Sequence, residues 1–367
     1  MQGTIKRYPD TLIILTTLLL LGIGVVMVYS ASAVLAYQKF EGDSFYFAKR
    51  QLMWAVLGVI SMFIMMNYEY HKLKRVAKPL LIICFLFLIA VVIPGIGSVR
   101  GGSRAWLGIG SFGIQPSEFA KLGLIIFFAY YLEKHQGRIS EFRRGLLPPL
   151  ALVTAAVGLI MLEPDLGQST VLMGTVIIII FAAGAQVKHL LGLASLAIPV
   201  FIALVAVAPY RLKRIFAFLD PWAFPLDAGY HIIQSLYAIG PGGLLGLGLG
   251  RSRQKFLYLP EPQTDFVFSI LAEELGFIGG ATVLLLFLLL VWRGLRTAIT
   301  APDTFGSLLA VGITGMIAVQ VIINIGVVTG SMPVTGITLP FISYGGSSLT
   351  LMLTGVGILL NISRQTR

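Results

Sequence analysis

Long apolar stretches separated by short polar segments recur along the whole chain. About 20 residues of α-helix cross the hydrocarbon core of a bilayer, and several of these stretches approach or exceed that length. The pattern therefore predicts an all-α, polytopic integral membrane protein with about ten transmembrane helices. The predicted spans are Leu12–Tyr29, Leu52–Met66, Leu80–Ile93, Phe119–Leu132, Leu146–Leu162, Ser169–Ala183, Leu190–Ala208, Phe266–Trp292, Ser307–Thr329 and Ser348–Leu360.

Basic residues gather in alternate short loops, which orients the predicted helices. Cytoplasmic loops carry the excess of Lys and Arg in membrane proteins. With the N-terminus in the cytoplasm, the short outer loops hold few basic residues, and an even number of helices places the C-terminus in the cytoplasm too. The basic residues of the short outer loops are Lys39, Lys49, Arg50, Arg100 and Arg104.

One long loop, residues 209–264, falls on the outer side of this topology. Long loops escape the positive-inside rule, so one interpretation is simply a translocated segment. The other interpretation is a cationic surface that holds an anionic ligand, because loops of this length within compact domains are commonly functional. Its basic residues are Arg211, Lys213, Arg214, Arg251, Arg253 and Lys255.

Composition supports one membrane domain over residues 1–367. Apolar residues make up 57% of the chain and charged residues 12%, whereas soluble domains are about 25% charged. The net charge of +11 is scattered through loops and forms no basic stripe, which argues against nucleic-acid binding. The single cysteine, Cys84, lies in an apolar run, and the four histidines lack the spacing of metal ligands.

Ionisable residues at the start of the fourth span are candidates for function. Pro116 indicates a helix start, and Glu118 and Lys121 are three residues apart, so they share a helix face and can pair. Charges within membrane segments are costly and are often functional. The pair has two interpretations, a buried structural ion pair and part of a ligand site.

Asp265 is the last polar residue before the long apolar segment Phe266–Trp292. One interpretation is a helix-capping carboxylate, since Asp is a favoured N-cap residue. The other is a general base at the boundary between water and membrane, facing the basic loop. Glu273 and Glu274 lie about two turns further along the same predicted helix, where we expect buried hydrogen bonds and a structural role.

Two other features stand at the outer ends of predicted spans. The segment Glu163–Gly167 forms an acidic turn between two spans. Glycines of 240–250 and of Gly345–Gly346 would let backbone amides approach an anion, although close helix packing also favours glycine.

Several motifs together resemble the shape, elongation, division and sporulation (SEDS) family of peptidoglycan glycosyltransferases. The resemblance covers nearly the whole chain, and its division and sporulation branch (FtsW and SpoVE) fits better than the rod-elongation branch (RodA). Five motifs in the family's order carry it: Gln115–Glu118 with Lys121; Glu163–Gly167; Leu259–Glu261 with Thr264–Phe266; Glu273–Gly276; and Pro340–Ser348. The branch assignment rests on Asn324–Gly330 and Pro260–Asp265.

The resemblance implies an enzyme that polymerises lipid II at the outer face of the bacterial cytoplasmic membrane. Asp265 would be the general base of an inverting transfer, and Glu118 and Lys121 would shape the cavity beside it. Lys255 and Arg104 are the first candidates to hold the diphosphate. Gln234, Ser343, Gly345 and Gly346 are further expected substrate contacts.

No metal site in the protein and no cofactor are predicted, although a divalent cation (Mg²⁺ or Mn²⁺) could accompany the diphosphate. The family implies a class B penicillin-binding protein as the partner that cross-links the strands, together with division or sporulation proteins. Two alternatives stay open. One is a flippase that moves lipid II across the membrane through a path lined by Glu118, Lys121, Glu273 and Glu274; the other is a scaffold without catalysis.

Overall fold

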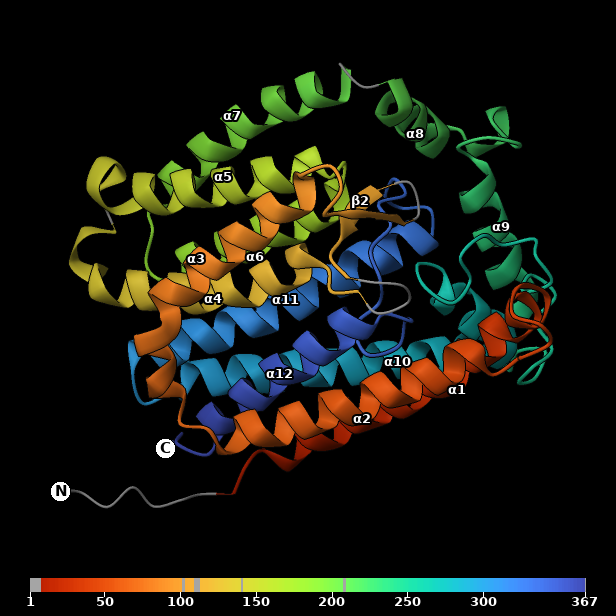
Figure 1. Cartoon of the computed structure of the whole chain (residues 1–367), viewed down its shortest axis with the longest axis horizontal. Coiled ribbons are helices and arrows are strands. Elements are labelled where there is room, and N and C mark those ends of the chain that lie inside the picture. Colours follow the sequence, from red (N-terminus) through yellow and green to blue (C-terminus); the bar gives the residue numbers. More distant parts are fainter. Residues whose placement is uncertain (1–7, 101–102, 109–112, 140, 207–208, 367) are drawn as a thin grey trace.

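The computed structural model describes residues 8–100, 103–108, 113–139, 141–206 and 209–366 of the chain. It is almost entirely helical, and each predicted span coincides with one helix (Figure 1). These helices are α1 Thr11–Lys39, α2 Tyr46–Asn67, α3 Leu73–Val92, α4 Pro116–Lys134, α5 Leu147–Leu162, α6 Leu166–Ala182, α7 Val187–Ala206, α10 Val267–Ile299, α11 Thr304–Val328 and α12 Gly346–Ser363. The short strands β1 Ser98–Arg100 and β2 Ser103–Trp106 form an antiparallel hairpin before α4.

Seven helices within the described residues are long and apolar enough to cross a membrane. They are α1, α2, α3, α5, α10, α11 and α12, where α3 and α5 are each counted together with the short helical turn that precedes it. The helix α6 is also apolar but shorter. This confirms an all-α polytopic membrane protein, whereas the count of ten crossings stays a prediction.

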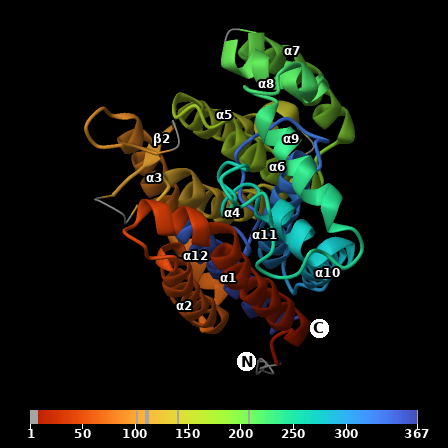
Figure 2. The ribbon, with the colours of Figure 1, turned by 90° about the vertical axis from the view of Figure 1, so that its right-hand side faces the viewer.

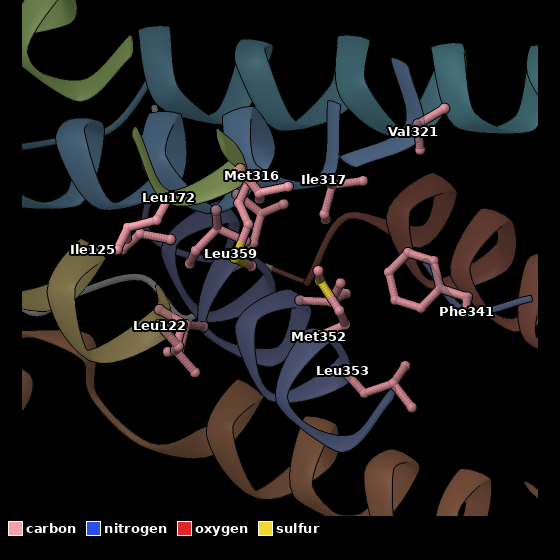
Figure 3. Packing of buried hydrophobic residues seen from close by; sticks show 14 of the residues in the cluster. Leu122, Ile125, Leu172, Met316, Ile317, Val321, Phe341, Met352, Leu353 and Leu359 are labelled. Atoms are coloured by element: carbon pink, nitrogen blue, oxygen red, sulfur yellow. The ribbon is translucent and has the colours of Figure 1, made fainter. Parts of the chain in front are cut away.

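The core forms around the two last helices of the chain. In α11 and α12, 67% and 72% of the most apolar window is buried, against 22% in α2 and in α3. The helix α12 packs along α2 so closely that a Cβ on Gly357 would lie 2.4 Å from the Met62 carbonyl oxygen. Figure 3 shows the apolar side chains of this core, among them Leu122, Ile125, Leu172, Met316, Ile317, Met352 and Leu353.

Both ends of the described chain lie at one end of the bundle (Figures 1 and 2). The Asp10 amide donates to Ser363 Oγ at 3.1 Å, and Arg293 Nε donates to the Asp10 carboxylate at 2.8 Å. Residues 209–264 lie at the opposite end, which we call the loop end (Figure 1). The shared position of the two termini agrees with an even number of crossings, while their cytoplasmic location stays a prediction.

The long loop is structured. It contains α8 Pro209–Leu219 and α9 Tyr230–Ile239, followed by a glycine-rich segment. Ser235 of α9 is held between Ser269 Oγ at 2.8 Å and the Val328 carbonyl oxygen at 2.6 Å. The loop is therefore packed on α10 and α11.

The predicted single helix over Phe266–Trp292 is wrong in one respect, because α10 is broken at Gly276 (φ 66°, ψ −164°). The glycine-rich segment enters the break: the Phe277 amide donates to the Gly243 carbonyl at 2.8 Å, and the Gly248 amide donates to the Glu274 carbonyl at 3.0 Å. A Cβ at Gly276 would lie 2.3 Å from the Gly246 nitrogen, so the break requires glycine at this position. Glu273 and Glu274 thus end a short helix, 267–275, at the loop end.

Candidate active site at the loop end

Asp265 precedes α10 without capping it. The N-cap residue is Phe266, and its side chain makes no capping bond, so the capping interpretation of Asp265 is wrong. The Asp265 carbonyl accepts a hydrogen bond from Asn324 Nδ2 at 2.9 Å. Across from the side chain lies Gly336 (φ 72°), whose Cβ, if present, would be 3.6 Å from Asp265 Oδ2. The carboxylate is therefore left available for chemistry.

The surroundings of Asp265 make it a stronger base than an ordinary aspartate. Part of the residue is accessible, but protein encloses the carboxylate on most sides. Burial, then the negative charges of Glu261 and Asp165, raise its pKa to about 7, against the lowering effects of Arg214 and a hydrogen bond from Thr264. A carboxylate with a pKa near the working pH is suited to accept a proton.

Arg214 of α8 is a cation whose charge acts on Asp265. Its Nη1 donates to the Val334 carbonyl at 3.3 Å, which places the guanidinium at the edge of the segment that passes Asp265. The sequence counted Arg214 among the basic loop residues but gave it no special role, since only the folded position of α8 distinguishes it from its neighbours.

Glu118 and Lys121 form the predicted ion pair, with Nζ 3.0 Å from Oε2. Both side chains are almost fully buried, at 2% and 1% exposure. Gln168 Nε2 donates to Glu118 Oε1 at 2.8 Å, and Lys121 Nζ donates to Gln320 Oε1 at 3.2 Å. These bonds satisfy the charges inside the bundle, as buried ions require.

The acidic turn before α6 connects this pair to Asp265. Asp165 caps α6 by accepting from the Gln168 amide at 2.9 Å, and its charge acts on both Asp265 and Glu163. Neither carboxylate oxygen of Glu163 has a hydrogen-bond partner in the described part of the chain, and the side chain is fully buried. Burial and then Asp165 raise the pKa of Glu163 to about 8. Sequence reasoning singled out this turn but assigned its residues no role.

The sequence pattern of the FtsW, RodA and SpoVE family of cell cycle proteins matches residues 10–367. The chain belongs to this family. It is 60% identical to stage V sporulation protein E of Bacillus subtilis, over 99% of both chains. It is 44% identical to a Geobacter protein (strain M18) named probable peptidoglycan glycosyltransferase FtsW, over 98% of this chain and 97% of that one.

Two solved structures share the fold. A chain of a peptidoglycan synthase complex that coordinates polymerization and crosslinking superposes with a TM-score of 0.78 at 34% identity, covering 97% of this chain and 98% of that one. RodA of Thermus thermophilus superposes with a TM-score of 0.72 at 31% identity, covering 98% of this chain and 97% of that one. The higher identities to SpoVE and FtsW confirm the predicted branch of the family.

Within this FtsW, RodA and SpoVE fold, the turn before α12 lies against the Asp265 segment. Ser343 Oγ donates to the Thr264 carbonyl at 2.5 Å, and the Tyr344 amide donates to the Gln263 carbonyl at 2.8 Å. Ser343, which was predicted to contact the substrate, therefore lies next to the residue that precedes Asp265.

The other predicted substrate contacts lie on several different elements. The Gly345 amide faces Gln51 Oε1 at 3.4 Å, and Gly346 starts α12 against Trp54. Gln234 is half-buried on α9, and Arg104 is half-buried in β2. Their roles toward a substrate stay predictions.

Lys255 is placed differently from the other predicted contacts. It is buried and pairs with Glu274, with Nζ 3.1 Å from Oε1, while Nζ also donates to the Gly250 carbonyl at 2.6 Å. In the described residues we find no contact that joins it to Asp265. Of the other basic loop residues, the side chain of Arg211 lies outside the described part.

Glu273 and Glu274 have the structural surroundings predicted for them. Glu273 accepts from Ser252 Oγ at 2.5 Å and from the Arg253 amide at 2.8 Å, and Glu274 accepts from Ser30 Oγ at 2.7 Å. The expectation of buried hydrogen bonds is confirmed. The acid pair anchors the long loop to α10 and α1.

Proposed function

We propose that this protein polymerises lipid II into glycan strands at the outer face of the bacterial cytoplasmic membrane, with Asp265 as the general base. Its membership of the family and the similarity to proteins named peptidoglycan glycosyltransferases support a transferase. The observation that carries the role of Asp265 is its carboxylate at the loop end, which caps no helix and has a pKa raised to about 7.

The family resemblance implies the reaction, and the placement of Asp265 is compatible with it. The 4-hydroxyl of the acceptor sugar attacks the anomeric carbon of the donor, and its proton passes to Asp265 as the new glycosidic bond forms. The bond from the anomeric carbon to the lipid diphosphate breaks, and the diphosphate leaves with the bonding electrons. An α-linked donor becomes a β-linked product, so one base is sufficient.

The leaving diphosphate needs positive charge more than it needs a proton. Arg214 stands in reach of the Asp265 region, and Arg104 and the remaining basic residues of the loop are further candidates, as predicted from the sequence. Lys255 is a weaker candidate because Glu274 already neutralises it.

The described residues hold no cluster of three His, Cys, Asp or Glu that fits a metal ion. A divalent cation that accompanies the diphosphate would therefore draw most of its oxygen ligands from the substrate.

The decisive experiment compares wild type with Asp265→Asn. Both proteins are purified with a class B penicillin-binding protein, the proposed partner, and incubated with labelled lipid II, and the glycan strands are separated on a gel. Asp265→Asn keeps the shape of the side chain and removes its basicity, so we expect polymer from wild type and a loss of at least about 100-fold in the variant. A folded variant that polymerises at the wild-type rate would refute the role of Asp265.

The flippase alternative is tested in the same preparation. Glu118 and Lys121 lie inside the bundle, where a transport path would pass, but they are already paired with each other and with Gln168 and Gln320. The position of the Asp265 carboxylate at the loop end favours the polymerase. Lipid II movement across vesicles by a wild type that makes no polymer would reverse this preference, and full cell function with Asp265→Asn would favour a scaffold.

A further inference from the structure

The segment that passes Asp265 has no regular secondary structure. Residues 333–339 run from the end of α11 toward the turn before α12 and belong to no helix or strand. Ile337 and Leu339 are buried, with 2% and 1% exposure, so this irregular backbone lies inside the protein. Buried carbonyl groups of such a segment need hydrogen-bond donors from elsewhere.

Two side-chain amides on one face of α11 supply these donors. Gln320 and Asn324 are four residues apart and are 0% and 1% exposed. Gln320 Nε2 donates to the Thr338 carbonyl at 3.0 Å. Asn324 Nδ2 donates to the Ile337 carbonyl at 2.7 Å and also to the Asp265 carbonyl at 2.9 Å.

Asn324 thus joins the backbone of Asp265 to the segment that faces its carboxylate. Both hydrogens of its amide nitrogen are engaged, one on each side of the gap between Asp265 and Ile337. A Cβ on Gly336 would lie 3.6 Å from Asp265 Oδ2, so the two segments are close together. A small shift of either segment would therefore move the carboxylate relative to a bound sugar.

We propose that Asn324 is a positioning residue for the glycosyl transfer: its amide fixes the distance between the Asp265 backbone and the 336–338 segment, and so holds the carboxylate where the acceptor hydroxyl is deprotonated. This inference rests on the proposed role of Asp265. Gln320 extends the arrangement to Lys121, to which it offers Oε1 at 3.2 Å. The ion pair of α4 is in this way connected to the same segment.

The test compares Asn324→Leu with the matched control Asn361→Leu. Asn361 is also a buried helical asparagine that donates to a backbone carbonyl, that of Met66 at 2.8 Å, but it lies at the end of the bundle that holds the termini. Each variant loses one buried amide, so the two should unfold at similar temperatures. Purified proteins are assayed with labelled lipid II for kcat and KM, and backbone hydrogen exchange is followed over 333–341.

We expect Asn324→Leu to lower kcat by about tenfold or more with KM within about twofold of wild type, because the base is displaced while the substrate contacts remain. Hydrogen exchange over 333–341 should rise in Asn324→Leu and stay unchanged in Asn361→Leu. If Asn324→Leu fails to fold, Asn324→Ala, which lacks the donor and adds no charge, takes its place with Asn361→Ala as its control and the same expected values.

A folded Asn324 variant with kcat within twofold of its Asn361 control overturns the inference, as does a loss confined to KM. These outcomes differ from failure of the proposed function, in which wild type itself makes no polymer.

Discussion

Three carboxylates share the loop end, and burial followed by their mutual repulsion shifts how they titrate. Burial is the largest cause that raises the pKa values of Glu163 and Asp265. The charge of Asp165 is the second cause for Glu163 and the third, after Glu261, for Asp265. Burial raises the pKa of Asp165, and the hydrogen bonds that it accepts from the Gln168 amide at 2.9 Å and from Gln115 at 3.3 Å act against that rise. The negative charge of Asp165 in turn raises the pKa of its neighbour Asp265.

This arrangement predicts the pH dependence of the reaction. A general base works when deprotonated, so the polymerisation rate should rise with pH through a midpoint near 7, the pKa of Asp265. Asp165→Asn removes a negative charge that raises this pKa, so the midpoint should move to lower pH. Asparagine caps a helix as well as aspartate does, so α6 should remain intact. Initial rates across the pH range check the prediction, and an unmoved midpoint would contradict it.

At the scale of the helix, the break in α10 separates the short helix that directly follows Asp265 from the long remainder of α10. Residues 267–275 are tied to the glycine-rich segment by the Leu247 amide, which donates to the Glu273 carbonyl at 2.9 Å. The remainder of α10 starts afresh with carbonyls of that segment as its caps. The loop is therefore part of the helix geometry at this point.

Gly276→Ala should destabilise the protein by about 1–3 kcal/mol, because alanine would have to adopt the positive φ and would contact the Gly246 backbone. Gly280→Ala is the matched control in the same helix, since its Cβ meets only the Phe268 ring edge at 3.4 Å. Thermal unfolding in detergent can be followed by a thiol-reactive dye at the buried Cys84. Equal unfolding temperatures for the two variants would contradict the prediction.

The membrane helices could be predicted from sequence, whereas the loop-end contacts could not. Hydropathy places the helices because the bilayer demands a long apolar run from each, and the spacing of Glu118 and Lys121 predicts their pair. No local pattern marks Gly276, since its φ is imposed by a segment some 30 residues earlier in the chain. Lys255 looked like a phosphate ligand because loop cations are indistinguishable in sequence until a partner such as Glu274 is in place.

At the scale of the whole molecule, the two ends of the bundle are chemically different. The end with both termini carries the Asp10–Arg293 pair and the Tyr70, His71 and Asp303 cluster, and the loop end carries the candidate active site. This polarity gives the proposed topology a direct consequence: the two ends face opposite compartments.

Single cysteines test this orientation. In a Cys84→Ser background, Leu226→Cys in the long loop and Tyr8→Cys before α1 introduce thiols at two positions that are each 93% exposed. A membrane-impermeant maleimide should label Leu226→Cys in intact cells and Tyr8→Cys only after lysis. The reverse labelling would invert the predicted topology. Labelling of both in intact cells would place both sites outside, which requires an even number of crossings between them and contradicts the predicted odd number.

The central position of α12 has a consequence for biosynthesis. This helix follows all the others in the chain, yet it fills the space beside α2 and supplies the core of Figure 3. Gln51 of α2 donates to the Ser343 carbonyl at 3.1 Å, and the Tyr70 amide donates to Asn361 Oδ1 at 3.0 Å. Polar groups that are synthesised early therefore have hydrogen-bond partners that are synthesised late. Helices inserted by the translocon must therefore wait side by side in lipid until the ribosome has delivered α12, and maturation of the protein is separated in time from its insertion.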